Sequence, residues 1–117
     1  MKYYLDTNIC IYFLKGKNIK LKNKLLSFHP GNIKIPSIVK AELYYSAERS
    51  KKKDENTEKI NQFLFPFELI GFNNKECMEY SKIRSDLEIR GEIIGPNDII
   101  IASIVKANNG TLVTNNE

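Results

Sequence analysis

Short apolar segments alternate along this chain with longer segments in which apolar residues recur at helical spacing. The first apolar segment, 2–5, stops at Asp6-Thr7-Asn8, which are residues typical of a helix start. Three apolar side chains follow at the spacing of a helix, namely Ile9, Tyr12 and Phe13. Gly16 is placed to close that helix, so this part of the chain predicts a buried strand followed by a short helix.

The same alternation continues through the rest of the chain. Helical periodicity predicts helices over residues 19–28, 37–44 and 73–91, and a further helix over 95–105 that is nearly apolar all round and therefore central. Apolar runs predict strands over residues 33–35, 67–72 and 111–114. Asn73 is placed to cap the helix toward Gly91, and Asn109-Gly110 ends the last one. The run from Glu48 to Lys59 is densely charged, and we interpret it as a solvated helix end or an exposed connection.

Strands separated by helices predict an α/β fold with a parallel sheet that is covered on both faces, because parallel strands need crossover connections. In such sheets functional groups gather beyond the carboxyl ends of the strands. Three features of the chain are expected there, namely Asp6, Asp98 and the turn Thr114-Asn115-Asn116.

Composition limits the class of protein more than its function. A chain of 117 residues fits one domain spanning 1–117. The net charge of +4 makes a polyanionic partner plausible. Cys10 and Cys77 lack the spacing of a zinc or redox motif, and no signal peptide or membrane span is evident, so we expect a soluble, cytoplasmic protein.

Three acidic residues stand out by their positions. Asp6 follows the first strand, although an aspartate there is more often a helix cap than a catalyst. Asp98 falls in the first turn of an apolar helix, with Asn97 available to cap that helix instead. Glu42 has apolar neighbours in its helix, which suggests partial burial, although a solvent-facing glutamate is the commoner explanation for such a residue taken alone.

If these three carboxylates meet at one end of the sheet, their repulsion would raise their pKa values unless a cation compensates. Oxygen ligands without histidine or thiolate favour Mg²⁺, with Mn²⁺ as the alternative. Because Mg²⁺ in proteins often touches a substrate phosphate, phosphodiester hydrolysis is a natural function for such a site.

Four segments together resemble the VapC toxins of bacterial VapBC toxin-antitoxin pairs, which are PIN-domain ribonucleases. In chain order they are 5–10 (LDTNIC), 37–43 (SIVKAEL), 95–102 (GPNDIIIA) and 112–116 (LVTNN). The resemblance implies a PIN-like three-layer α/β/α sandwich and a magnesium-dependent endoribonuclease that arrests translation. Asp6, Glu42 and Asp98 would be its metal ligands and catalytic residues.

The resemblance also implies substrate and partners. A metal-bound water would attack the phosphodiester in line and leave 5′-phosphate and 3′-hydroxyl ends. The segments 6–11 and 95–98 look closest to toxins that cut the anticodon stem-loop of initiator tRNA. A VapB-type antitoxin would lie in an apolar groove, and a homodimer is expected. The aromatic residues that would line the groove, unless they are plain core, are Tyr12, Phe13, Tyr44 and Tyr45.

Two departures from the family pattern concern the C-terminus. Many PIN domains place a fourth acid after the last Thr-Asn, whereas this chain has the amide of Asn116, followed by Glu117. Family members also continue with another short helix and edge strand. We therefore expect a C-terminally short PIN-like domain whose strand 111–114 has an unpaired edge.

Several other polar residues allow both a functional and a structural interpretation. Thr7, Asn8 and Thr114 would support the acids, or act only as cap and strand-end residues. Arg84 would approach the site or form a surface ion pair, and His29 has no expected catalytic role. The basic residues that would face RNA phosphates, or simply be solvated, are Lys15, Lys17, Lys20, Lys22, Lys24, Arg49 and 51–53.

Two other functions remain open from the sequence. A catalytically impaired PIN-like module would bind RNA or antitoxin without cutting. A phosphoaspartate protein would accept a phosphoryl group on Asp6, but phosphatases of that kind need a second aspartate where this chain has Asn8.

Overall fold

Strands and helices alternate in the computed structural model, which describes residues 1–16 and 18–114. The strands are β1 (Tyr3–Leu5), β2 (Ile33–Pro36), β3 (Glu68–Ile70) and β4 (Thr111–Val113). The α-helices are α1 (Thr7–Lys15), α2 (Ile19–Ser27), α3 (Ser37–Glu48), α4 (Lys53–Leu64), α5 (Asn74–Ile89) and α6 (Pro96–Ala107). A 3₁₀ turn, η1 (Pro30–Asn32), precedes β2.

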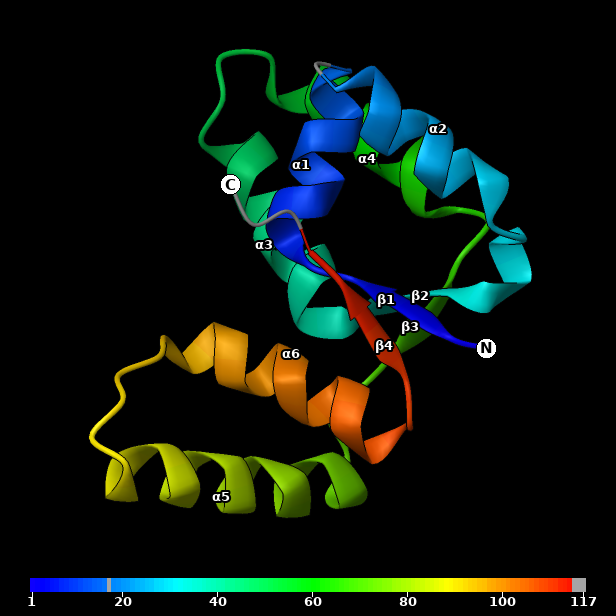
Figure 1. The fold of residues 1–117 in the computed structure, drawn as a ribbon. Coiled ribbons are helices and arrows are strands. Elements are labelled where there is room, and N and C mark those ends of the chain that lie inside the picture. Colours follow the sequence, from blue (N-terminus) through cyan, green and yellow to red (C-terminus); the bar gives the residue numbers. More distant parts are fainter. Residues whose placement is uncertain (17, 115–117) are drawn as a thin grey trace.

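The four strands form one parallel sheet in the order β3-β2-β1-β4 (Figure 1). Tyr3 pairs with Ile33 of β2 on one side and with Thr111 of β4 on the other. The parallel sheet predicted from the alternation of strands and helices is therefore confirmed. The observed β3 covers only residues 68–70 of the predicted 67–72.

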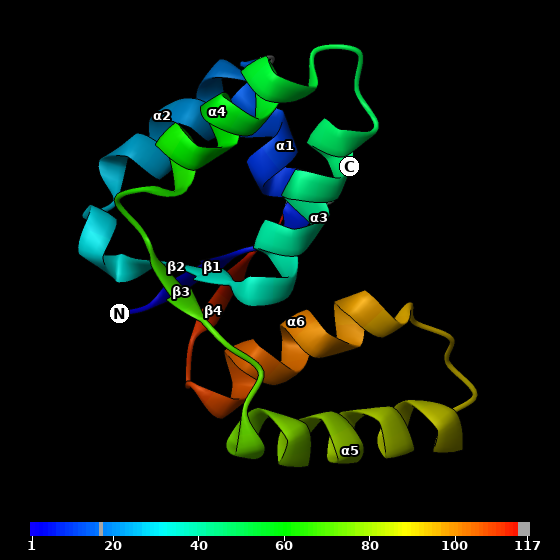
Figure 2. The same cartoon turned by 180° about the vertical axis from the view of Figure 1, so that it is seen from behind.

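Helices cover both faces of the sheet, as Figures 1 and 2 show from opposite sides. One layer contains α1, α2, α3 and α4, and the other contains α5 and α6, which lie side by side. Buried side chains from several of these elements form one core, among them Leu5, Ile9, Ile35, Val39 and Ile101. This arrangement is the expected three-layer α/β/α sandwich. None of the helices in the described residues is long and apolar enough to cross a membrane.

Local signals in the sequence explain the position of α1. The Asp6 side chain caps the helix, since its Oδ1 accepts a hydrogen bond from the backbone N–H of Ile9 at 2.8 Å. Gly16 ends it at φ 65°, in the left-handed conformation that glycine adopts without a Cβ clash. Both predicted boundaries of this helix are confirmed.

Helix α4 was not predicted as a separate element. The charged run 48–59 contains the end of α3, a turn, and the first half of α4, so interpreting it as a helix end or a connection is correct only in part. The only buried residues of α4 are Ile60 and Leu64, which pack into the core. Because these lie in the second half of the helix, the first half has no apolar periodicity to reveal it.

Strand β4 lies at the end of the sheet and pairs only with β1 within the described residues, as the sequence predicted for this edge. Gly110 leads into the strand and lies against the buried ring of Tyr4. A Cβ at Gly110 would stand 2.2 Å from Cε1 of Tyr4, so any larger residue would force this ring or the strand to move.

A buried carboxylate joins α5 to the end of α6. Glu76 is 1% exposed and accepts hydrogen bonds from the backbone N–H of Asn73 at 3.0 Å and from Nδ2 of Asn108 at 2.9 Å. Burial acts to raise the pKa of the Glu76 carboxyl, but the Asn108 amide and the backbone N–H groups of Glu76 and Asn73 outweigh it. The pKa in the folded chain therefore lies below its ordinary value.

This lowered pKa predicts a pH-dependent contribution to stability. A carboxyl whose pKa is lower in the folded chain stabilises the fold above its unfolded-state pKa, and this contribution is lost as pH falls through the folded-state pKa. Between about pH 5 and about pH 3, the free energy of unfolding should therefore fall more steeply in the wild type than in Glu76→Gln. Urea denaturation across this range measures both slopes, and equal slopes would contradict the assignment.

Candidate functional site

The three predicted acids come from three elements that begin at the carboxyl edge of the sheet. Asp6 lies between β1 and α1, Glu42 lies in the second turn of α3 directly after β2, and Asp98 lies in the first turn of α6. Glu42 is half-buried, whereas Asp98 is exposed. The expected partial burial of Glu42 is confirmed.

Glu42 is the centre of the hydrogen bonds at this edge. Its Oε1 accepts a bond from the Thr7 hydroxyl at 2.6 Å, and its Oε2 accepts one from Nδ2 of Asn97 at 3.3 Å. Thr7 follows Asp6 in the sequence, and Asn97 precedes Asp98. The Glu42 carboxylate thus lies between the immediate neighbours of the other two acids.

Asp6 caps the helix that it precedes, whereas Asn97 does not cap the helix in which it lies. Asp6 has the capping role that was its structural interpretation, and only one of its oxygens is engaged in the cap. Asn97 was available to cap α6, but it does not do so. The cap residue of α6 is Gly95, no side chain caps the helix, and the Asn97 amide bonds to Glu42 instead.

Carboxylate oxygens are the hard ligands that Mg²⁺ and Mn²⁺ prefer, so the donor set fits such a cation in kind. The three carboxylates do not converge on one point. Within residues 1–16 and 18–114, no group of three or more His, Cys, Asp or Glu side chains is arranged to hold a metal. A carboxylate has about four lone-pair sites, so the bonds to Thr7 and Asn97 leave Glu42 able to bind a cation. The metal-ligand assignment stays a prediction.

The remaining supporting residues have no visible link to the three acids in the part of the chain that the structure describes. Asn8 and Thr114 are exposed, and no side-chain hydrogen bond of either is recorded within the described residues. The last three residues, Asn115, Asn116 and Glu117, lie outside the described residues. Their possible role as a fourth metal ligand stays a prediction.

Cys10 is buried beneath this edge of the sheet. Burial, and after it the charge of Asp6, raises the pKa of the Cys10 thiol far above its ordinary value. The thiol therefore stays protonated and is a poor nucleophile or metal ligand.

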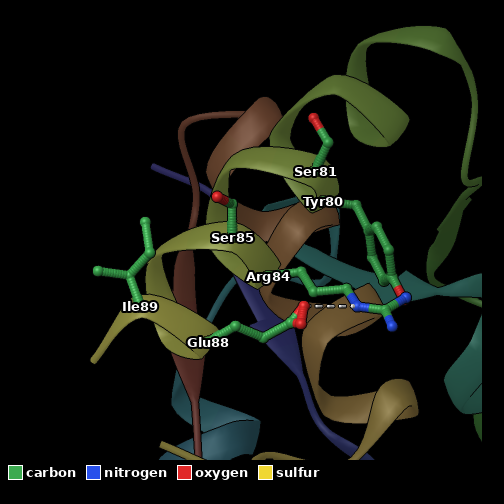
Figure 3. Close-up of a pocket in the computed structure, with 6 residues that line it drawn as sticks. All are labelled: Tyr80, Ser81, Arg84, Ser85, Glu88 and Ile89. Carbon is green, nitrogen blue, oxygen red and sulfur yellow. Dashed lines mark hydrogen bonds and ion pairs between the residues drawn. The ribbon is translucent and has the colours of Figure 1, made fainter. Parts of the chain in front are cut away.

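Other candidate residues take structural roles. A shallow hollow of about 560 Å³ lies on one face of α5. Among the residues that line it, Figure 3 shows the Arg84 side chain between those of Tyr80 and Glu88. The ion pair between Arg84 and Glu88, at 3.5 Å, confirms the surface interpretation of Arg84. None of the three predicted ligands lines this hollow. His29 caps η1, with its Nδ1 accepting from the N–H of Gly31.

A second hollow, of about 450 Å³, opens between α1, α3 and α4. Its floor is apolar and includes Leu43, and its rim carries Lys15, Ser46 and Lys59. Its lining on α3 begins at Leu43, the residue after Glu42, and none of the three acids lines it.

The four aromatic residues expected to line a groove are absent from the lining of this hollow. Phe13 and Tyr44 pack against the core, while Tyr12 and Tyr45 are exposed. Phe13 lines a different and smaller hollow, of about 190 Å³, beside α2. Phe13 and Tyr44 therefore take the alternative role that the sequence allowed, that of core residues, and the four aromatics share none of these hollows.

The contact between Asn97 and Glu42 was missed by the sequence analysis. The two residues are 55 positions apart, and asparagine beside a helix start is ordinarily explained as a cap. The contact depends on how α6 packs relative to α3, and no local signal in the sequence reports that.

Comparison with known proteins defines the class. The PIN domain family matches residues 3–117. The chain therefore belongs to the PIN-domain family.

The more specific relationship follows from individual relatives. Ribonuclease VapC2 of Rickettsia felis is 46% identical over 117 residues, covering 99% of this chain and 87% of the relative. The tRNA(fMet)-specific endonuclease VapC of Shigella flexneri is 30% identical, with the same coverage. The crystal structure of VapBC2 from Rickettsia felis, bound to a DNA fragment from its promoter, matches with a TM-score of 0.93 and 45% identity, covering 99% of this chain and 88% of that chain. Within the PIN-domain family the chain is one of the VapC ribonuclease toxins of VapBC toxin-antitoxin systems.

The bond from Thr7 to Glu42 leads to a stability prediction. Thr7→Val keeps the branched shape but removes the hydroxyl donor, so it should lower the free energy of unfolding by about 1–2 kcal/mol in the absence of divalent cations. Thr7→Ser keeps a hydroxyl and serves as the control. Urea denaturation in EDTA measures both, and a valine variant as stable as the serine variant would show that the hydroxyl contributes nothing.

Proposed function

We propose that this chain is a Mg²⁺-dependent endoribonuclease that uses Asp6, Glu42 and Asp98 as its metal ligands. The observation that carries the proposal is the position of the Glu42 carboxylate, which is bonded to the sequence neighbours of both aspartates. Membership of the VapC ribonuclease toxins supports the reaction class.

The bound cation would supply a nucleophilic water and stabilise the charge that develops on the phosphoryl oxygens. The protein residues have separate tasks. The carboxylates of Asp6, Glu42 and Asp98 hold the cation, and Thr7 orients Glu42 through its hydroxyl. Mn²⁺ satisfies the same donor set and would replace Mg²⁺ in assays.

The distribution of charge supports an RNA substrate. Most of the lysine and arginine residues lie within 1–66, and acidic residues predominate over 67–117. The layer formed by α1–α4 is therefore the more basic one, and it would attract the phosphate backbone toward the acids. Lys15, Lys20 and Arg49 are exposed on this layer. Lys17 lies outside the described residues.

The anticodon stem-loop of initiator tRNA is the substrate that we propose. Its support is the relative from Shigella flexneri that is named a tRNA(fMet)-specific endonuclease. A direct comparison of initiator tRNA with elongator tRNAs at equal concentration tests this choice.

Asp6→Asn separates the proposed catalytic role from the structural one. Asparagine caps helices about as well as aspartate, so α1 should stay intact, but the charge that holds the cation is lost. Cleavage of tRNA should fall by about 100-fold or more, and EDTA should abolish the wild-type activity until Mg²⁺ is restored. Gel analysis of cleavage by the wild type, Asp6→Asn and the surface control Asp54→Asn makes the comparison. Equal cleavage by the wild type and Asp6→Asn would refute the assignment.

The same geometry supports a position for the antitoxin. We propose that a segment of a VapB-type antitoxin occupies the hollow between α1, α3 and α4, since it runs along α3 toward Glu42. Its apolar floor and polar rim suit an amphipathic segment. The VapBC2 structure from Rickettsia felis supports such a partner.

Filling this hollow should weaken antitoxin binding without unfolding the chain. Ser46→Trp places an indole at the exposed rim, and Ser81→Trp places the same side chain on α5 as a control. The Kd of the complex with the antitoxin encoded beside this chain's gene should rise by at least about 10-fold for Ser46→Trp only. Titration calorimetry measures both values, and equal affinity of the two variants would rule out this hollow.

The homodimer expected from the family stays a prediction. Exposed apolar side chains on α5 and in the loop that follows it, Ile89 and Ile93, are available for such a contact. Light scattering of the purified chain checks the prediction.

A further inference from the structure

The start of α6 has an unusual arrangement of hydrogen bonds. Asn97 is the second residue of the helix, after Pro96, and asparagine near a helix start usually bonds to the backbone of its own helix. Here no side chain caps α6, and the Asn97 amide bonds across to Glu42 on α3. Within the described residues this is the only side-chain hydrogen bond between these two helices.

The two bonds to Glu42 differ in length. The bond from Thr7, at 2.6 Å, is short and typical of a hydroxyl on a charged oxygen, whereas the bond from Asn97, at 3.3 Å, is longer than the common N–H···O distance of about 2.9 Å. Glu42 is therefore held firmly toward α1 and more loosely toward α6. The Asn97 contact joins the helix that carries Asp98 to the Glu42 carboxylate.

We propose that Asn97 is a positioning residue of the metal site. It holds the Glu42 carboxylate beside the first turn of α6, sets the separation between Glu42 and Asp98, and places a partial positive charge on Glu42 before a cation binds. It acts through Glu42 and does not itself touch the substrate. This inference rests on the proposed metal site. Asn97 is neither one of the three acids nor one of the supporting residues that the sequence suggested.

A direct alternative is an ordinary surface hydrogen bond. Exposed polar pairs usually contribute little, and such a bond would have no consequence for cation binding. The two interpretations differ in what the removal of the amide does to metal affinity, because groups that orient a ligand typically change metal affinity about 10-fold or more.

Mn²⁺ binding to the full chain separates these interpretations. Asn97→Ala should raise the Kd for Mn²⁺ by about 10-fold, and Asn97→Gln, which retains the amide, should recover part of the loss. Asn23→Ala, at an exposed position on α2, is the matched control and should bind as the wild type does. Titration calorimetry gives the three affinities, with urea denaturation to confirm equal folding. An Asn97→Ala variant with wild-type affinity overturns the inference.

A second measurement tests the contact without any metal. In EDTA, the side-chain amide signals of Asn97 in a ¹⁵N–¹H NMR spectrum should move when Glu42→Gln removes the negative acceptor, while those of Asn23 should stay in place. The Asn97 signals are identified by their loss in Asn97→Ala. Signals that do not respond overturn the inference alone. A wild-type chain that binds no Mn²⁺ overturns the proposed metal site and, with it, the role of Asn97 toward the cation.

Discussion

The parallel direction of β1, β2 and β4 is the constraint on which the rest of this structure depends. Because all strands end at the same edge of the sheet, the segments that follow them begin side by side, however far apart they are in the sequence. Asp6 and Glu42 are brought together in this way, and α6, packed on the opposite face, begins near enough for Asn97 to reach Glu42. An antiparallel sheet would distribute these groups over two edges.

Neutral hydrogen-bond donors contact two of the three acids at this edge of the sheet. The Thr7 hydroxyl and the Asn97 amide both direct partial positive charge at Glu42, and the backbone N–H of Ile9 does the same at Asp6. Each of these hydrogen bonds therefore orients one of the two carboxylates at this edge of the sheet.

The layer formed by α5 and α6 is held in place by a separate buried group. Glu76 ties the start of α5 to Asn108 at the end of α6, and β4 follows directly from there. The opposite end of α6 carries Asp98. Helix α6 therefore contacts a buried structural carboxylate, that of Glu76, at one end and carries the exposed carboxylate of Asp98 at the other.

The sequence by itself determined the α/β class, the parallel sheet and most element boundaries, because these follow from local periodicity, cap residues and the order of strands and helices. It also nominated three acids as metal ligands, and that assignment stays a prediction. Asp6 and Gly16, for example, mark the two ends of α1, because an aspartate caps a helix start and a glycine adopts the left-handed conformation at a helix end. Only the tertiary structure decided that the charged segment 53–59 belongs to a helix, since its buried residues, Ile60 and Leu64, lie further along. The tertiary structure also decided that the Asn97 side chain bonds to Glu42 and not to the backbone of its own helix. This bond depends on how closely α3 and α6 pack, and the local conformational preferences of the residues do not fix that distance.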